Sequence, residues 1–413
     1  MARRKAELSP RQGSDQSLPP PSAIGPEHLL ALIRTGAATS RGALAQLTGL
    51  SRSTVAQRVD ALIEAGYVRE GGQAASSGGR PATVLEFDGS TKFVLAAALE
   101  RCQMVTGLIN FAGRVAESRV SEIRIEDGPA VILPLVAAEF RALLSSSQIS
   151  SSSLSGIGVA VPAPVDHRTG RPIEPTIMPG WHDCPIREEL GREFALPAYV
   201  DNDANVMALA EFRHLERTTD SMLYVLASDG IGAGLVLGGR LYRGAVGAAG
   251  ALGHSVVAGS TALCTCGNIG CIAAVAGGRV IAGQLADQGY GTSSAADIVA
   301  LARQGKRQVT NRLRAAGRDL GQVLAGVVNL LDPGTVVIGG EFAEVEAFIT
   351  GIREEVYRRA LPLVAGHLQI SKALLGAEAG IKGASTLVAN ELLAPRPVMD
   401  HLIPGAAPVR GPR

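Results

Sequence analysis

One short segment of the chain, residues 253–273, carries side chains of the kind that bind zinc. They are His254, Cys264, Cys266 and Cys271, and the three thiols are among only five cysteines in 413 residues. One imidazole and three thiolates make a closed tetrahedral site for Zn²⁺, with no position left for an activated water. The spacing therefore predicts a structural zinc site, and a loop with incidental cysteines stays open as the alternative.

The other two cysteines, Cys102 and Cys184, are isolated in the sequence. Because the clustered thiols are better used on a metal than in disulfides, we expect a reducing, cytoplasmic setting. The chain starts with Met-Ala-Arg-Arg-Lys and further polar residues, and we count no apolar run of the roughly 18 residues that a membrane span needs. The sequence therefore predicts a protein that is neither exported nor membrane-spanning.

A second group of candidate residues lies near the N-terminus, on the outer face of a predicted helix. Arg52, Ser53, Thr54, Gln57 and Arg58 offer guanidinium, hydroxyl and amide groups. Such groups reach phosphates and base edges in a major groove. We predict that these residues contact an operator in double-stranded DNA.

The elements that must position these side chains have the order of a helix-turn-helix in residues 40–68. Thr48-Gly49-Leu50 supplies the turn, and Ser51 is a suitable cap for the second helix. Apolar residues recur at helical spacing and predict the inner faces of the helices. These are Leu29, Leu30 and Ile33 in an earlier helix at 28–34, then Ala43, Leu44 and Leu47, then Val55, Val59 and Leu62.

Two short strands, at 67–70 and 83–87, follow and would form a wing. The loop between them contains Ser77-Gly78-Gly79-Arg80-Pro81. A glycine-flanked arginine is thin enough for a minor groove, so Arg80 is predicted to contact DNA as well. The alternative is that the helix-turn-helix serves only packing or dimerisation, with Arg80 merely solvated.

Composition places the chain among globular proteins with more than one domain. Hydrophobic residues make up 46%, charged residues 19% and aromatic residues 4%, so the core must consist mainly of Ala, Val, Leu and Ile. The formal net charge of +1 gives no general attraction to nucleic acid, so DNA binding must come from a local patch. We expect a disordered arm at 1–24, the DNA-binding domain at 25–88, a larger domain at 89–395 and a disordered tail at 396–413.

The larger domain consists of apolar, glycine-punctuated strands that alternate with helices. Such alternation predicts a mixed α/β fold. Strands are expected at 93–99, 105–111, 157–161, 199–200, 222–227, 232–237 and 336–338. Helices are expected at 131–144, 204–212, 280–288, 295–303 and 311–330, with a serine-rich loop at 145–155.

With these features in place, residues 25–395 resemble the ROK family of sugar-responsive repressors and sugar kinases. Besides the metal cluster, the motifs that carry the resemblance are Gly-Gly-Arg-Pro at 78–81, Val-Pro-Ala-Pro-Val-Asp at 161–166, Met-Pro-Gly-Trp at 178–181, Asp-Asn-Asp-Ala-Asn at 201–205, Gly-Ile-Gly-Ala-Gly at 230–234 and Val-Ile-Gly-Gly at 337–340. The resemblance implies the fold of the actin-like ATPases and sugar kinases, with two α/β lobes flanking a cleft. Lobe one would span about residues 93–201 with 382–393, and lobe two about residues 202–381.

The resemblance also assigns catalytic roles. Asp203 matches the base that takes a proton from the sugar hydroxyl, and Asn202 matches a hydroxyl-binding residue, although an aspartate at this position also suits a helix cap. Kinases of the family carry Asp-x-Gly-Gly-Thr after the first strand, where Ala98 and Glu100 replace the Asp and a Gly here. Asp229 stands where relatives usually carry Thr. Since phosphoryl transfer needs positive charge and close backbone amides, we predict no enzyme and a vestigial base.

Sugar binding is altered too. Two carboxylates that accept hydrogen bonds from sugar hydroxyls in relatives are replaced by Ala251 and Ala273. Each lost charge-assisted bond is worth about 1.5–3 kcal/mol, so an ordinary hexose is a poor fit. Asn202, Asp203 and His254 remain as candidate effector-binding residues. A less hydroxylated effector, or no effector, stays open.

These observations lead to one hypothesis and two alternatives. The hypothesis is a ROK-type repressor that binds a palindromic operator as a homodimer or tetramer and responds to a sugar or sugar-derived effector. Effector binding would change lobe closure and hence the spacing of paired recognition helices. The alternatives are a ROK sugar kinase with a DNA-binding arm, and a DNA-bound scaffold that only oligomerises. Trp181, the only tryptophan, is left open between a core position and the cleft.

Overall fold

The computed structural model describes residues 24–73, 83–215 and 219–394. The predicted arm at 1–24, apart from Ile24, the predicted tail at 396–413 and the loop with Arg80 therefore lie outside the described residues. The chain divides into two compact units, one of residues 1–89 with 390–413 and one of residues 90–389. Each unit has buried apolar residues of its own.

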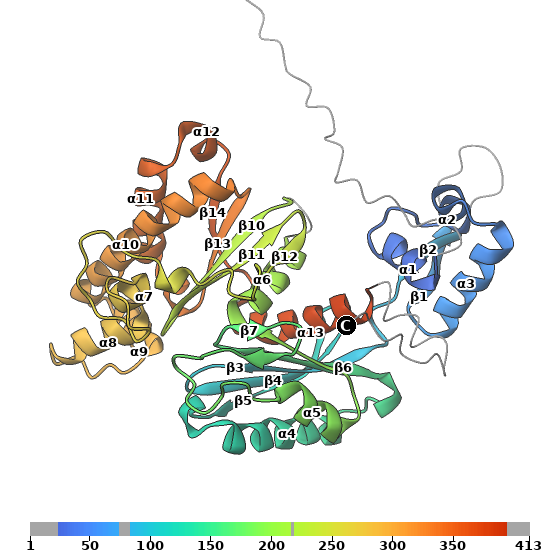
Figure 1. The fold of residues 1–413 in the computed structure, drawn as a ribbon, viewed down its shortest axis with the longest axis horizontal. Helices are drawn as coiled ribbons and strands as arrows, with labels where there is room; N and C mark the ends of the chain where they lie inside the picture. Colours follow the sequence, from blue (N-terminus) through green and yellow to red (C-terminus); the bar gives the residue numbers. More distant parts are fainter. Residues whose placement is uncertain (1–23, 74–82, 216–218, 395–413) are drawn as a thin grey trace, which may run out of the picture. The chain divides into compact units, whose positions relative to one another are not determined.

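The N-terminal unit contains a helix-turn-helix followed by a two-stranded antiparallel sheet (Figure 1). Its elements are α1 (Pro26–Arg34), α2 (Arg41–Thr48), α3 (Arg52–Glu64), β1 (Val68–Gln73) and β2 (Thr83–Phe87). The Ser40 and Ser51 side chains cap α2 and α3 by accepting backbone N–H bonds of 3.2 Å each. Gly49 ends α2 at φ 70°, a left-handed conformation that favours glycine. Local sequence signals thus set the turn.

Packing in this unit agrees with the predicted inner faces of α1 and α3, whereas in α2 the predicted Ala43 is only half-buried. The predicted core residues of α1 and α3, together with Leu44 of α2, are all at most 4% exposed. Leu47, however, is 49% exposed, so its prediction as a core residue is wrong. In the short α2 the buried pair is Leu44 and Thr48, and the Thr48 hydroxyl donates a 2.6 Å bond to the Leu44 carbonyl. That bond removes the cost of burying a hydroxyl.

The larger unit is built on two five-stranded mixed sheets. The strands of the first sheet are β3 (Phe93–Leu99), β4 (Gln103–Asn110), β5 (Val115–Glu122), β6 (Leu154–Val161) and β9 (Ala198–Asn202). Those of the second are β10 (Met222–Ala227), β11 (Ile231–Leu237), β12 (Arg240–Tyr242), β13 (Thr335–Gly339) and β14 (Gln369–Lys372). The strand orders, β5-β4-β3-β6-β9 and β12-β11-β10-β13-β14, match position for position. This repeated topology confirms the predicted two-lobed α/β fold.

Helices cover both faces of the first sheet. α4 (Pro129–Ser146) and α5 (Ile186–Phe194) share one apolar cluster with it, and α6 (Asp203–His214) and α13 (Ala379–Leu392) share another. Figure 1 shows α13 on the side of this sheet opposite α4 and α5. α6 also packs on β10 and β11 of the second sheet, so it lies between the two lobes.

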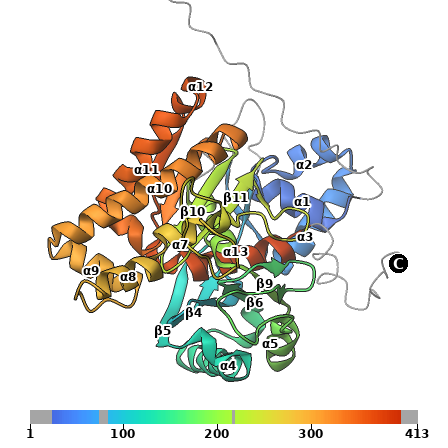
Figure 2. The same cartoon turned by 60° about the vertical axis from the view of Figure 1, so that its left-hand side comes forward.

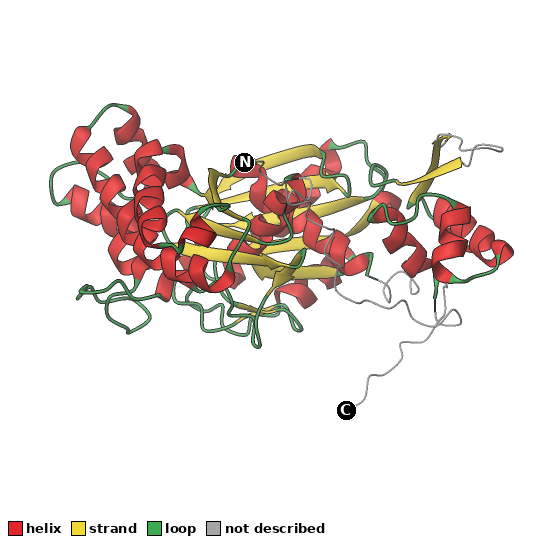
Figure 3. Ribbon diagram, turned by 90° about the horizontal axis from the view of Figure 1, so that it is seen from above, coloured by secondary structure: helices red, strands yellow, loops and turns green. Residues whose placement is uncertain are grey.

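The second sheet is covered on its other face by a larger group of helices. They are α7 (Ile272–Ala276), α8 (Gly278–Ala286), α9 (Ala295–Arg303), α10 (Arg307–Leu331), α11 (Glu346–Arg359) and α12 (Pro362–Ala365). α10 and α11 lie side by side in Figures 1 and 2. Figure 3 shows the chain coloured by secondary structure, with a group of helices at the left-hand end of the strands.

Several elements differ from the sequence predictions. β5 and β14 are edge strands that we did not predict, and along β5 half-buried and exposed residues alternate, so no apolar run marks it. The helices α5 and α11 were also not predicted, since both are polar on average. The predicted loop at 145–155 is shorter, because α4 extends to Ser146 and β6 begins at Leu154.

One helix bears on the expectation that the chain does not span a membrane. α4 is 18 residues long with a mean hydropathy of 1.4, so by length and composition it could cross a membrane. Its buried residues belong to the core cluster of lobe one.

Trp181, which the sequence left open between the core and the cleft, is a core residue. It is fully buried, and its Nε1–H donates a 3.1 Å bond to the Ile125 carbonyl.

Candidate functional site

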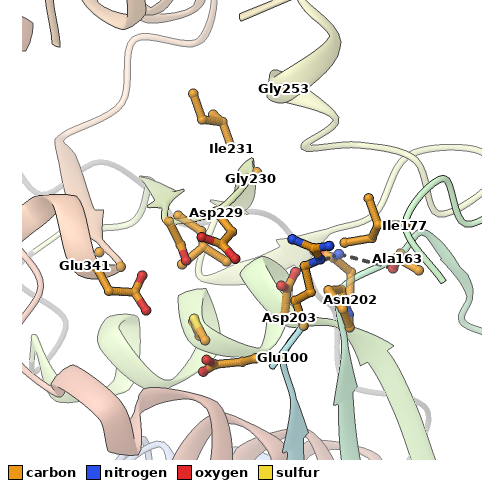
Figure 4. A pocket seen from close by; sticks show the side chains of 18 of the residues that line it. Glu100, Ala163, Ile177, Asn202, Asp203, Asp229, Gly230, Ile231, Gly253 and Glu341 are labelled. Atoms are coloured by element: carbon orange, nitrogen blue, oxygen red, sulfur yellow. Dashed lines mark hydrogen bonds between the residues drawn. The ribbon is translucent and has the colours of Figure 1, made fainter. Parts of the chain in front are cut away.

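A cleft of about 1110 Å³ is lined by residues of both lobes (Figure 4). It is approached by the ends of three strands: the turn after β3, the start of α6 after β9 and the turn after β10. Ligands of α/β folds characteristically bind at the carboxyl ends of strands. The topology therefore places this cleft where a ligand site is expected.

Asn202 and Asp203 lie at the start of α6 and point into the cleft in Figure 4. Asn202 is the N-cap, because its Oδ1 accepts the Asn205 N–H at 3.3 Å. Its amide donates bonds of 3.1 Å to the Ala163 carbonyl and 2.9 Å to Asp203 Oδ1. Asp203 is thus the first residue of the helix rather than its cap, and it stays available to a ligand.

The electrostatics of Asp203 suit a proton acceptor. Burial raises the pKa of its carboxyl to about 6, even though the Ala204 N–H and the Asn202 amide stabilise the charged form. A base with a pKa near neutrality is what general-base chemistry uses. The candidate base therefore has a suitable pKa and lies in the cleft.

The turn after β3, where the resemblance leads us to expect a phosphate loop, carries Glu100. The Glu100 N–H donates to the Gln103 carbonyl at 2.9 Å, and Gln103 Nε2 donates to Glu100 Oε2 at 2.6 Å. Burial raises the Glu100 pKa to about 7, with further contributions from Glu341, Asp203 and Asp229. These four carboxylates line one cleft (Figure 4).

The other two residues of the phosphate-loop prediction have structural roles. Ala98 is 2% exposed within β3 and shares an apolar cluster with α13. Asp229 lines the cleft, and its Oδ1 accepts the N–H of Ala295 at 2.8 Å, at the start of α9. A carboxylate at a helix N-terminus is stabilised by the helix dipole. Asp229 is therefore satisfied by the protein itself.

The four predicted metal ligands come together in space. Their donor atoms all lie within 4.8 Å of one another, and Cys266 Sγ lies 3.8 Å from Cys271 Sγ. Cys264 Sγ lies 3.8 Å from His254 Nδ1. Tetrahedral zinc with Zn–S bonds of about 2.3 Å requires sulfur atoms about 3.8 Å apart, so this donor set fits the ion. The described residues thus contain a cluster that could hold a metal.

This cluster adjoins the cleft. His254 and Cys264 are both metal-ligand candidates and cleft-lining residues. Ala251 and Ala273 line the same wall, so their methyl groups face the space that a ligand would fill. The structure thus brings together every residue predicted for effector binding.

The predicted DNA-contacting residues differ in their environments. Arg52, Ser53 and Gln57 are exposed on α3. The Ser53 and Thr54 hydroxyls lie 2.9 and 2.8 Å from Ser51 Oγ, within the helix cap. Arg58 donates to the carbonyl of Ile24, so its guanidinium is already engaged. Arg80 lies outside the described residues.

An ion-pair network that sequence inspection missed surrounds α3. Arg41 of α2 pairs with Asp60 of α3 at 2.7 Å and also with Glu70 of β1. Hydrogen bonding to Glu70 is the main reason that the Arg41 pKa is raised. The network joins the recognition helix to the wing, and spacing alone could not reveal it because its members are far apart in sequence.

Comparison with known proteins completes this description. Residues 124–391 match the ROK family, and residues 27–69 match a winged helix-turn-helix DNA-binding family. A xylose repressor of Caldicellulosiruptor bescii is 28% identical over 372 residues, covering 86% of this chain and 92% of the relative. A glucokinase of Halalkalibacterium halodurans is 30% identical over 298 residues, covering 68% of this chain and 90% of the relative. The crystal structure of a ROK family transcriptional regulator, a homolog of the E. coli MLC protein, matches with a TM-score of 0.75 and 25% identity, covering 91% of this chain and 98% of that one.

Proposed function

The chain belongs to the ROK family, and from this premise we propose that it is a DNA-binding transcriptional repressor whose larger domain binds a ligand without phosphorylating it. The observation that carries the proposal is the joining of a winged helix-turn-helix to a complete two-lobed domain, along nearly the full length of relatives named xylose repressors. In this proposal the protein acts in the cytoplasm as a homodimer or tetramer. Paired recognition helices would read a palindromic operator.

The loss of kinase activity is supported by the turn after β3. A transferring phosphoryl group needs positive charge and close backbone amides, whereas Glu100 brings a carboxylate whose raised pKa reflects burial and three acidic neighbours. Two cationic side chains that line the cleft are paired: Arg101 with Glu126 and Lys372 with Glu344, each at 2.7 Å. We expect no ATP-dependent phosphorylation of xylose, glucose or N-acetylmannosamine by the pure protein. Phosphorylation of a sugar by the wild-type protein that is lost in Asp203→Asn would instead support the kinase alternative. The similarity to a glucokinase is the reason to test for it.

We assign the polar edge of the ligand to Asn202 and Asp203 within a lining that also holds other carboxylates, arginines and His254. Apolar side chains of the same lining are Ala163, Pro164, Ile177, Ala248, Ala251 and Ala273. A sugar with few hydroxyls, or a sugar derivative with an apolar face, would satisfy Asn202 and Asp203 without leaving hydroxyls unpaired elsewhere. Binding in the cleft would change lobe closure and thereby operator affinity.

The metal cluster is proposed to hold structural zinc. His254, Cys264, Cys266 and Cys271 would fill all four positions, so the ion would cross-link the segment between β12 and α7. When bound, zinc supplies a fixed charge that holds three thiolates together. The chain's own contribution is the backbone turn that presents them, closed by the Cys264 N–H bond of 2.8 Å to the Asn268 carbonyl.

The experiment is a gel-shift and footprint series on the DNA upstream of the gene across a range of salt concentrations. We expect a palindromic footprint and about ten-fold or greater weakening by Arg52→Ala. Arg52→Lys is the matched variant, because it keeps the phosphate attraction and loses the bidentate base contact. Absence of any footprint at low salt would remove the proposal. Weakening by Arg58→Ala that leaves sequence preference unchanged would fit its bond to Ile24.

A further inference from the structure

An ion pair between a half-buried arginine and a buried aspartate joins the two lobes beside the candidate ligand residues. Arg243 Nε donates a 2.7 Å bond to Asp201 Oδ2, and the two side chains are 19% and 3% exposed. Asp201 lies on β9 in lobe one, directly before Asn202, whereas Arg243 follows β12 in lobe two. A pair this deeply buried must be well hydrogen-bonded to offset the loss of hydration.

Asp201 meets that requirement on both oxygens. Its Oδ1 accepts the Asn202 N–H at 2.8 Å and the Asn205 side-chain amide at 3.0 Å, while Oδ2 takes the Arg243 guanidinium. One carboxylate therefore fixes the start of α6, which presents the ligand residues, and also holds the chain that leaves β12.

That chain, residues 243–254, forms a strap along the cleft. Gly247, Ala248, Ala249, Gly250, Ala251, Gly253 and His254 all line the cavity. The strap crosses lobe one so closely that a Cβ on Gly247 would lie 2.3 Å from the Val165 carbonyl oxygen, and the φ of Gly247 is 82°. At its far end it reaches His254 of the metal cluster. Only glycine fits at position 247 for both reasons.

The middle of the strap is tied to β11 of lobe two by one backbone bond, in which the Ala233 N–H donates to the Gly250 carbonyl at 2.9 Å. A second bond lies within the strap, where the Ala249 N–H donates to the Arg243 carbonyl at 3.1 Å. Two features hold the strap against lobe one. The first is the Arg243 side chain, which bonds Asp201, and the second is the close approach of the Gly247 backbone to Val165. We propose that Arg243 and Asp201 are positioning residues that hold the strap as the cleft wall facing Asn202 and Asp203.

This inference deepens the proposed function, because it concerns how the ligand site is kept in shape, but its test requires neither DNA nor a ligand. Hydrogen exchange is measured on full-length, metal-loaded protein for wild type, Arg243→Met and Arg243→Lys. In Arg243→Met the amides of residues 244–252 exchange about ten-fold or more faster, while those of α10 keep their wild-type rates. Arg243→Lys, which keeps a charge for Asp201, restores much of the protection.

Arg240→Met is the matched control, since Arg240 is an exposed arginine on β12 three residues earlier in the chain. It leaves the strap amides unchanged. The double variant Asp201→Asn/Arg243→Met exchanges no faster in the strap than Arg243→Met alone, because the interaction is already lost. The proposal is overturned if the strap amides exchange at the same rate in Arg243→Met as in Arg240→Met. It is also overturned if Arg243→Met accelerates exchange equally in the strap and in α10. A failed gel shift overturns the repressor proposal and leaves this result standing.

Discussion

Two groups of titratable side chains, one that lines the cleft and one that adjoins it, differ in how they are held. The donor atoms of His254, Cys264, Cys266 and Cys271 converge to within 4.8 Å of one another. Three carboxylates of the acidic group each have a separate partner: Glu100 has Gln103, Asp203 has the Ala204 N–H and Asp229 has the Ala295 N–H.

The difference shows what each group is suited for. Thiols that converge around one point are stable together only with a cation between them, so the first group fits a metal ion. Carboxylates with separate protein donors need no shared ion; burial raises the Glu100 pKa, and repulsion from the neighbouring carboxylates adds to that rise. Proximity of ionisable groups alone therefore does not define a metal site; convergence of unsatisfied donors does.

The largest effect that would test this comparison is loss of a metal ligand. Cys271 is fully buried, and Cys271→Ala removes one of four donors. We expect bound zinc to fall from about one per chain to near zero and the melting temperature to drop by on the order of 10 °C, because metal binding contributes directly to folding. Elemental analysis and thermal denaturation measure both. A chelator should destabilise wild type by a similar amount and leave the variant unaffected.

Cys102→Ala is the control for this experiment, because Cys102 is an exposed cysteine outside the cluster. It should retain the metal and the wild-type melting temperature. Full zinc content in Cys271→Ala would show that the converging donors do not form the site.

The second prediction concerns the acidic group and its pH dependence. The pKa of Glu100 is raised from 4.5 to about 7, so the folded protein holds a proton that the unfolded chain has released. Stability from this group is complete below pH 4.5 and is lost as the pH rises through 7. Glu100→Gln should therefore leave stability unchanged near pH 4 and raise it by about 3 kcal/mol near pH 8, at about 1.4 kcal/mol per pKa unit.

Urea denaturation of both proteins at several pH values measures that difference. Glu126→Gln is the control, because Arg101 lies 2.7 Å from this neighbouring carboxyl and Glu126 has a lowered pKa. Its substitution should remove stability at neutral pH instead of adding it. A Glu100→Gln effect that does not depend on pH would contradict the raised pKa of the buried Glu100 carboxyl.

The contrast also explains what could be predicted from the sequence. The metal cluster was predictable because three ligands lie within eight residues, 264–271, and rare residue types signal them. The helix-turn-helix was predictable because Ser40, Gly49 and Ser51 act on their immediate neighbours. Such signals depend on local geometry, which the sequence contains.

The remainder depends on contacts between distant segments. Arg58 was predicted to face DNA, but its guanidinium bonds Ile24, 34 residues away. The Asp201–Arg243 pair joins two lobes across 42 residues, and neither residue is unusual in its own segment. The place of Trp181 could not be predicted either, because its indole N–H bonds the Ile125 carbonyl, which is distant in the sequence. Edge strands such as β5 escape because half of their residues face solvent.

The smallest expected effect sharpens the comparison within the acidic group. Asp229 contributes to the raised pKa of Glu100, and it also accepts the Ala295 N–H at the start of α9. Asp229→Asn keeps an acceptor for that N–H but removes the charge that the helix dipole favours, at a cost of about 0.5–1 kcal/mol. It also removes one negative charge that raises the Glu100 pKa. The plot of unfolding free energy against pH should therefore fall less steeply between pH 4.5 and 7 than in wild type. The two consequences oppose each other at high pH, and only a pH series of urea denaturation separates them. If the slope stays as steep as in wild type, the Asp229 charge does not act on Glu100, and burial together with Glu341 and Asp203 sets the Glu100 pKa.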